Sequence, residues 1–233
     1  MDPTTTTLSG VFLGYFVLQL CANACKLSFR RDPSMVTIAA FAASMVSHAY
    51  LILASLAAAI MLELDFRVKL PALTPDVYLL VLGLIIYMLI FLLDVYLRLV
   101  LRRRRPTTML DVDEHFIITP RSPALWELAL FNFVLLKGFA YEVFLRGFAL
   151  TVLMGVFSDS PAIPIFIVAV MEFLLRPLGE RLVPTFIISI LLSVVFWASS
   201  GLLVTIIIRV VGNYIVSLYM VYLTFKGGGE STA

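Results

Sequence analysis

Charged side chains are scarce in this sequence: Asp, Glu, Lys and Arg together make up 14% of its 233 residues. A soluble domain carries roughly 25% charged residues, so most of this chain must face lipid or other apolar helices. Hydrophobic residues make up 61% of the chain, and its mean hydropathy is +1.04. The formal net charge of +2 is too small to indicate a nucleic-acid partner.

Residues that bind metals or cofactors are equally few. The chain has two histidines, His48 and His115, whereas zinc requires three or four nitrogen, sulfur or oxygen ligands. No glycine-rich phosphate loop is present, and a serine nucleophile such as Ser199 or Ser200 has no nearby histidine to act as its base. We therefore expect no metal and no cofactor. The two cysteines, Cys21 and Cys25, lie four residues apart, and we expect them to pack in a helix interface.

The apolar residues form continuous runs and do not alternate with polar residues, which argues against strands. The runs are 18 to 34 residues long, and a helix needs roughly 20 residues to cross a bilayer. The sequence therefore predicts an all-α, polytopic transmembrane helical bundle of about seven spans, at residues 8–27, 35–62, 77–101, 124–157, 161–178, 183–200 and 201–225. The first run has no basic region before it and is long enough to span, which indicates a retained helix and not a cleaved signal.

The spans divide into two regions and a tail. Residues 1–123 form an N-terminal three-span region that ends in a polar loop of cytoplasmic type, and residues 124–226 form a four-span core. Residues 227–233 form a short tail, which we expect to be flexible. The run at 124–157 exceeds one perpendicular span, so it is either a tilted helix or a broken one.

Basic residues predict the orientation, because cytoplasmic loops are enriched in Lys and Arg. With seven spans, twelve basic residues fall on the side of the C-terminus and only Arg67 and Lys69 on the other side. The N-terminus is therefore expected outside and the C-terminus on the cytoplasmic side. The twelve are Lys26, Arg30, Arg31, Arg98, Arg102, Arg103, Arg104, Arg105, Arg121, Arg176, Arg181 and Lys226.

Charges within the spans mark a polar centre. Glu142 and Arg146 lie four residues apart with the acid first, which is good geometry for pairing on one helix face. Lys137 lies about a turn and a half earlier, and Arg209 and Asn213 form a second pair at the same spacing. A charge deep in a bilayer costs at least about 2.5 kcal/mol, so such residues are functional candidates.

Other polar residues in the spans have a simpler interpretation. The pairs Asp94–Arg98 and Glu172–Arg176 lie near span ends, where we expect the partners to satisfy each other and fix helix packing. A lone intramembrane histidine such as His48 is more often a hydrogen-bonded core residue than a ligand or a proton relay.

Three short patterns lie in the C-terminal half: the segment 141–147, which reads Tyr-Glu-Val-Phe-Leu-Arg-Gly, then Phe166 with Val170, and finally Arg209 with Asn213. Together they resemble the motifs of the CAAX-protease and bacteriocin-processing (CPBP) family of intramembrane proteases. The first family motif is two glutamates, three residues, arginine and usually glycine, and the segment 141–147 is similar to it. Phe166 and Val170 lie where the family has phenylalanine and, four residues later, histidine. Arg209 and Asn213 lie where it has histidine and, four residues later, asparagine. The resemblance covers residues 124–225.

The resemblance implies catalytic positions of which only Glu142, Arg146 and Asn213 keep the family residue. In the family, the first glutamate and two histidines surround the water that attacks the peptide, and those positions here are Tyr141, Val170 and Arg209. Arginine cannot accept a proton, and valine has no polar atom. We therefore expect the chemistry to be lost, with Glu142, Arg146, Arg209 and Asn213 forming one buried network across two helices and Tyr141 and Lys137 beside it.

Three functions remain open on the sequence alone. The first is a catalytically silent CPBP-like protein that serves as a structural or binding subunit of a membrane complex, in contact with the lipid bilayer and other membrane protein subunits. The second is a CAAX-type intramembrane endopeptidase that uses Glu142, which would need a water-filled cavity at that residue. The third is a small-molecule transporter or channel, which would need a polar path to both sides; no inverted repeat supports it.

Overall fold

A computed structural model describes residues 3–28, 33–64, 75–104, 131–175, 182–199 and 201–228, and the structural statements below concern those residues. They are almost entirely helical and contain no strand, which confirms the all-α class. The helices are α1 (Pro3–Ser28), α2 (Pro33–Met61), α3 (Pro75–Arg104), a composite helix over 131–156, α7 (Ala162–Leu175), α8 (Leu182–Ser199) and α9 (Leu202–Gly228).

The helix boundaries follow the apolar runs closely. Three of the helices begin at a proline, Pro3, Pro33 or Pro75, because the fixed φ of proline suits the first helical position. Helix α1 begins earlier than the apolar run at 8–27, and Thr7 Oγ1 donates to the carbonyl oxygen of Pro3 in its first turn at 2.7 Å. Helix α9 extends to Gly228, so it includes the first two residues of the predicted tail, and residues 229–233 lie outside the described part.

The composite helix is the central element. It consists of a π-helical segment η1 (Phe131–Leu136), α5 (Lys137–Glu142), a second π-helical segment η2 (Val143–Leu150) and α6 (Thr151–Val156). The junctions keep right-handed helical backbone angles, so the described part is unbroken, and residues 124–130 lie outside it. All eight residues of η2 are buried. The wide turns of π-helix often occur at functional sites, and this segment carries Arg146.

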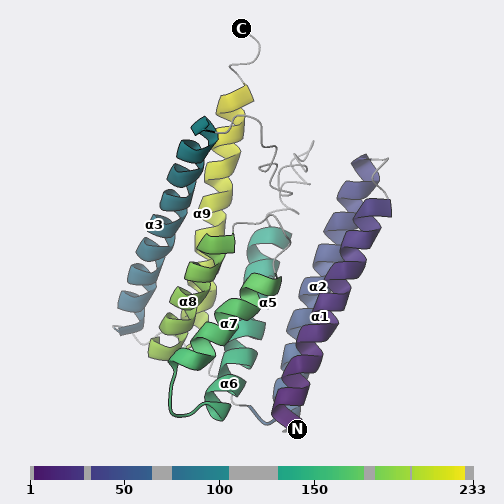
Figure 1. Ribbon diagram of the computed structural model, residues 1–233, viewed down its shortest axis with the longest axis vertical. Helices are drawn as coiled ribbons and strands as arrows, with labels where there is room; N and C mark the ends of the chain where they lie inside the picture. Colours follow the sequence, from purple (N-terminus) through teal and green to yellow (C-terminus); the bar gives the residue numbers. More distant parts are fainter. Residues whose placement is uncertain are drawn as a thin grey trace.

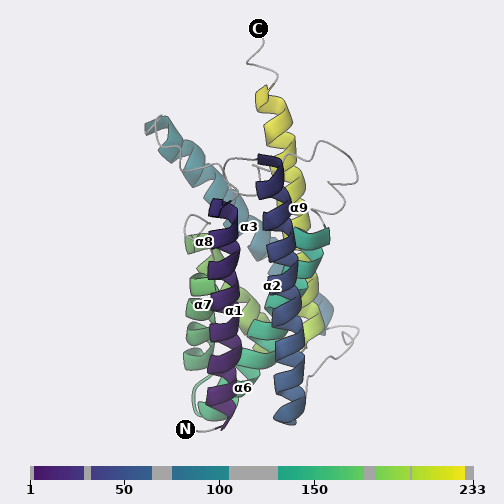
Figure 2. The ribbon, with the colours of Figure 1, turned by 90° about the vertical axis from the view of Figure 1, so that its right-hand side faces the viewer.

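The helices form one bundle in which α1 and α2 lie side by side at one edge (Figures 1 and 2). Helices α3, α8 and α9 form the opposite edge, and the composite helix and α7 lie between the two groups (Figure 1). The N-terminus and the C-terminal end of α9 lie at opposite ends of the bundle in both views. The first region predicted from the sequence is therefore divided in space, because α3 packs against α8 and α9 of the second region.

The bundle has two apolar cores. The larger joins α1, α2, the composite helix and α7 around aromatic residues such as Tyr15, Phe144 and Phe148. The smaller joins α3, α8 and α9 around Tyr87, Leu192 and Ile208 and their neighbours. Helices of the larger core and helices of the smaller core both contact the composite helix. A polar residue on the composite helix can therefore lie between the two cores.

Three helical stretches within the described residues are long and apolar enough to cross a membrane: Ala42–Met61, Val77–Asp94 and Val134–Val156. Four shorter apolar helices accompany them, at Thr6–Cys21, Ala162–Leu175, Val183–Ser199 and Leu202–Leu218. Only 17% of Val77–Asp94 is buried inside the bundle, against 72% of Val134–Val156. The outer face of α3 is therefore apolar and exposed, which is typical of a protein associated with a membrane. Cys21 is also exposed, so the interface expected for it is absent from the described chain.

Candidate functional site

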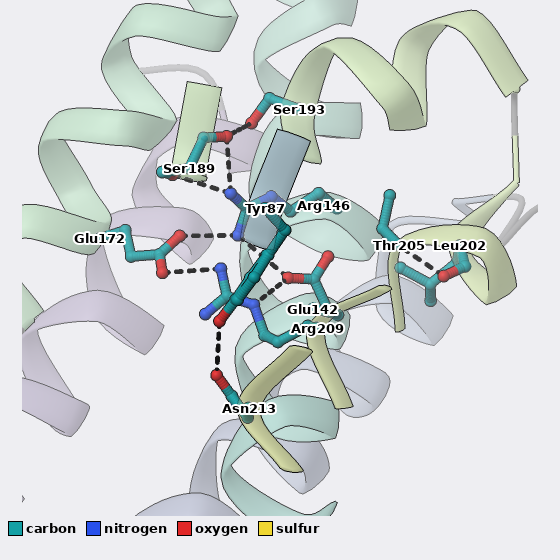
Figure 3. A network of polar contacts seen from close by, with 10 residues as sticks. All are labelled: Tyr87, Glu142, Arg146, Glu172, Ser189, Ser193, Leu202, Thr205, Arg209 and Asn213. Atoms are coloured by element: carbon teal, nitrogen blue, oxygen red, sulfur yellow. Dashed lines mark hydrogen bonds and ion pairs between the residues drawn. The ribbon is translucent and has the colours of Figure 1, made fainter. Parts of the chain in front are cut away.

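Two glutamates and two arginines meet at the centre of the bundle (Figure 3). Glu142 and Arg146 extend from the composite helix, Glu172 from α7 and Arg209 from α9. Arg146 Nη1 lies 3.3 Å from Glu142 Oε1 and 2.8 Å from Glu172 Oε2. Arg209 Nε lies 2.5 Å from Glu142 Oε1, and its Nη2 lies 2.7 Å from Glu172 Oε1.

These four ion pairs close into a ring in which acid and base alternate; we call it the charge ring. Each arginine contacts both glutamates, and the four formal charges cancel. The side chains of Glu142, Arg146 and Glu172 are 0% exposed and that of Arg209 is 3% exposed. Buried charges must be paired because an isolated ion loses its hydration without compensation, and the ring provides this pairing.

Helix α8 adds neutral partners to the ring. Arg146 Nη2 donates to both the carbonyl oxygen and the hydroxyl oxygen of Ser189, each at 2.8 Å. Ser193 also donates to the Ser189 carbonyl, at 2.8 Å. Thr185, Ser189 and Ser193 are buried and recur every four residues, so one face of α8 is small and polar where Arg146 approaches it. Arg146 therefore links three separate helices.

Tyr141 separates the charge ring from the α1–α2 pair. The guanidinium carbon of Arg209 lies 5.8 Å from the centre of its ring, within the range of a cation–π contact. Its hydroxyl lies 3.0 Å from the hydroxyl of Tyr15 on α1, and Gln19 Nε2 donates to Tyr15 at 2.7 Å. One side chain thus contacts both the ring and the first helix.

A second, looser polar cluster lies on the α2 side of Tyr141. His48 Nδ1 lies 3.4 Å from both Asn132 Oδ1 and Ser44 Oγ, and the imidazole centre lies 6.2 Å from that of Tyr141. His48 is 2% exposed and Asn132 is fully buried. His48 is therefore a hydrogen-bonded core residue, as its sequence context predicts. Asn132 Nδ2 has no hydrogen-bond partner among the described residues.

Asn213 takes a different position from the one predicted. Its Oδ1 accepts a hydrogen bond of 2.7 Å from the Tyr87 hydroxyl of α3, beside the charge ring (Figure 3). The ring thus draws its members from three helices and its neutral partner Ser189 from a fourth, whereas the sequence predicts a network across two. Lys137 is half-buried at the start of α5. Val170 is half-buried on α7, and Phe166 packs edge-on against Phe186 of α8 at 5.9 Å.

Glu172 is the member that sequence reasoning missed. Its spacing from Arg176 indicates a local pair, but both of its carboxylate oxygens contact arginines of other helices. Arg176, and the side chain of Arg98 in the Asp94 pair, lie outside the described residues. Charge balance is the signal in the sequence that indicates this member. The formal charges of Glu142, Arg146 and Arg209 sum to +1, so a neutral buried network of these residues requires one further acid.

The arrangement favours charge stabilisation over proton transfer. Oε1 of Glu142 contacts both arginines, and Oε2 is buried without a hydrogen-bond partner among the described residues. No group of three His, Cys, Asp or Glu side chains that could hold a metal ion occurs in the part of the chain that the structure describes. No family model, no curated protein and no solved structure matches the chain. The resemblance to CPBP proteases therefore depends on the motif positions alone.

Proposed function

We propose that this chain is a multi-pass membrane protein without peptidase activity, built on a CPBP-like scaffold, which serves as a structural or binding subunit of a membrane complex. The observation that carries the proposal is the closed charge ring. A general base needs an oxygen that a bound water can reach. Glu142 directs Oε1 at two arginines, and its whole side chain, Oε2 included, is buried away from solvent.

The positions around Glu142 support the same interpretation. Tyr141 contacts Arg209 through its ring and Tyr15 through its hydroxyl. Val170 offers no polar atom, and Arg209 is a fixed cation that cannot accept a proton. The residues that replace the family's water-binding groups therefore stabilise the bundle and do not activate a nucleophile.

The distribution of polar residues argues against a transport path. A helix rises about 1.5 Å per residue. Glu142 therefore lies roughly 21 Å from the end of its helix at Val156. Glu172 lies roughly 15 Å from the start of α7 at Ala162, and Arg209 lies roughly 10 Å from the start of α9 at Leu202. Figure 1 shows these three helix ends at the same end of the bundle. The charges thus lie within roughly 11 Å of one another along the helices and pair in one closed ring, whereas a path would need charged groups that a solute can reach.

The exposed face of α3 supports the membrane assignment. Tyr78 and Tyr96 are both exposed, and the side chains between them include exposed Val81, Ile85 and Leu89. Eighteen residues of helix separate the two tyrosines, or about 27 Å at 1.5 Å per residue, which is close to the roughly 30 Å of a bilayer core. Tyrosine is enriched at both membrane interfaces. The lipid bilayer and other membrane subunits are therefore the proposed partners.

Incubation of the purified protein with prenylated and membrane-derived peptides tests the proposal. We expect no cleavage above that of a buffer control, and no difference between the wild-type protein and Glu142→Gln. Purification in mild detergent is the companion measurement, because a subunit should be recovered with other membrane chains. Reproducible cleavage that disappears in Glu142→Gln would reject the non-catalytic assignment.

A further inference from the structure

We propose that Glu142, Glu172 and the ring of Tyr141 form a binding site for a monovalent cation of the guanidinium class, which the chain fills with its own Arg209. The inference rests on the proposed function, since it treats the charge ring as a binding element and not as a catalytic one. Arg209 is then a built-in ligand that keeps the site closed.

The contacts of Arg209 match the chemistry of a guanidinium. Its Nε and Nη2 contact carboxylates of two different helices, at 2.5 Å from Glu142 and 2.7 Å from Glu172. The face of Tyr141 lies 5.8 Å from its central carbon. Planar guanidinium groups pair with carboxylates through several N–H groups at once and stack on aromatic rings, whereas an ammonium is a compact, strongly hydrated point charge. The site is therefore shaped for a flat cation with several donors.

The net charge of the residues around the site favours a ligand with a single positive charge. Without Arg209, the two glutamates and Arg146 sum to −1, so a single monocation restores neutrality. Lys137 is half-buried about a turn and a half before Glu142, and the imidazole of His48 lies 6.2 Å from the ring of Tyr141 on the α2 side. The ion pairs of the two carboxylates in the charge ring come from Arg146 and Arg209. A dication would leave the buried site charged, which is costly.

One acceptor in the site remains unused by the built-in ligand. Glu142 Oε2 is buried and has no hydrogen-bond partner among the described residues. Figure 3 shows it directed away from the ring of ion pairs. The position of Arg209 is set by the backbone of α9, whereas a free guanidinium can tilt to contact both oxygens of Glu142. The site therefore offers a small cation one more contact than it offers Arg209.

Chemical rescue of Arg209→Ala tests the inference. Ethylguanidinium replaces the atoms that this substitution removes, so millimolar ethylguanidinium should restore about half or more of the lost melting temperature in detergent, as a ligand that binds only the folded state does. Ethylammonium and urea at equal concentration are the matched controls, and neither should restore it. Wild-type protein should show no increase, because Arg209 fills the site.

Two further variants assign the rescue to this site. Arg209→Ala combined with Glu172→Gln should lose the response, and Arg209→Ala combined with Tyr141→Leu should respond more weakly. If Arg209→Ala alone is not monodisperse, solubilisation in ethylguanidinium should increase its monodisperse fraction in size-exclusion chromatography. Absence of rescue in both measurements, or equal rescue by ethylammonium, overturns the guanidinium site. Neither result alters the peptide-cleavage assay, so the two proposals fail independently.

Discussion

Glu142 and Glu172 lie on different helices, yet their carboxylates contact the same two arginines, Arg146 and Arg209. Each acid therefore keeps one cationic neighbour when a single arginine is removed, but the ring as a whole loses neutrality. This property separates the charge ring from a simple ion pair, in which removal of one partner isolates the other completely. It also determines how the ring should respond to mutation.

Neutralisation of one ring member should destabilise the fold more than neutralisation of two neighbouring members of opposite charge. Glu142→Gln and Arg209→Gln each leave one buried charge in excess, which costs about 3 to 5 kcal/mol in buried settings. The double variant is neutral again and should recover part of that loss. Thermal unfolding in detergent measures the three changes as a double-mutant cycle, and strict additivity would show that the two side chains are not coupled.

A parallel cycle with Arg146→Gln provides the comparison. Arg146 contacts both glutamates and also donates two hydrogen bonds to Ser189, so its replacement removes the link to α8 as well as the ring contacts. We expect the larger loss of melting temperature for Arg146→Gln. An equal or smaller loss would contradict a stabilising contribution from the Ser189 hydrogen bonds.

Gly212→Ala should separate α3 from α9. A Cβ at this position would lie 2.6 Å from Cε1 of Tyr87, and the ring of Tyr87 is held by its hydrogen bond to Asn213. Overpacking of this kind costs about 1 to 3 kcal/mol. Gly155→Ala is the matched control, because a Cβ there meets nothing within 4 Å, and it should be neutral or stabilising by up to about 1 kcal/mol. Equal melting temperatures for the two variants would contradict the close contact.

Tyr15→Phe should weaken the attachment of α1 to the composite helix. The substitution removes the hydroxyl that Tyr141 and Gln19 both contact, and the expected loss is about 1 kcal/mol. Tyr214→Phe is the control, since Tyr214 is 45% exposed. Tyr141→Phe combined with Tyr15→Phe should cost less than the sum of the single changes, and a full sum in thermal unfolding would show that the hydroxyls do not interact.

Reporter fusions should place the C-terminal end of α3 and the C-terminus of the chain on the same side of the membrane. Both helix ends lie at the same end of the bundle (Figure 1), and the twelve basic residues predict that this end faces the cytoplasm. A reporter after Leu64, beyond α2, should lie on the opposite side. Opposite sides for the first two reporters would reject the seven-span topology.

Much of the fold follows from the sequence, because the positions and lengths of the apolar runs predict where the helices lie. The apolar runs predict the helices to within a few residues, and the deep positions of Glu142 and Arg209 indicate that they meet. The sequence pairs Glu172 with Arg176 because spacing along one helix is visible in a sequence, whereas the contact of Glu172 on α7 with Arg209 on α9 is not. The position of Asn213 depends on Tyr87 of α3, which no local pattern relates to α9.

The members of the charge ring are synthesised in a fixed order along the chain. Glu142 and Arg146 emerge from the ribosome first, Glu172 follows on α7, and Arg209 comes last on α9. Until α9 arrives, the partial ring carries one uncompensated negative charge, and α9 itself carries an arginine that has no counter-charge on its own apolar stretch. Each lone charge is costly in lipid. Helix α9 and the two glutamates of the partial ring therefore stabilise each other when they meet. A chain truncated before α9 retains a buried negative charge without its counter-charge.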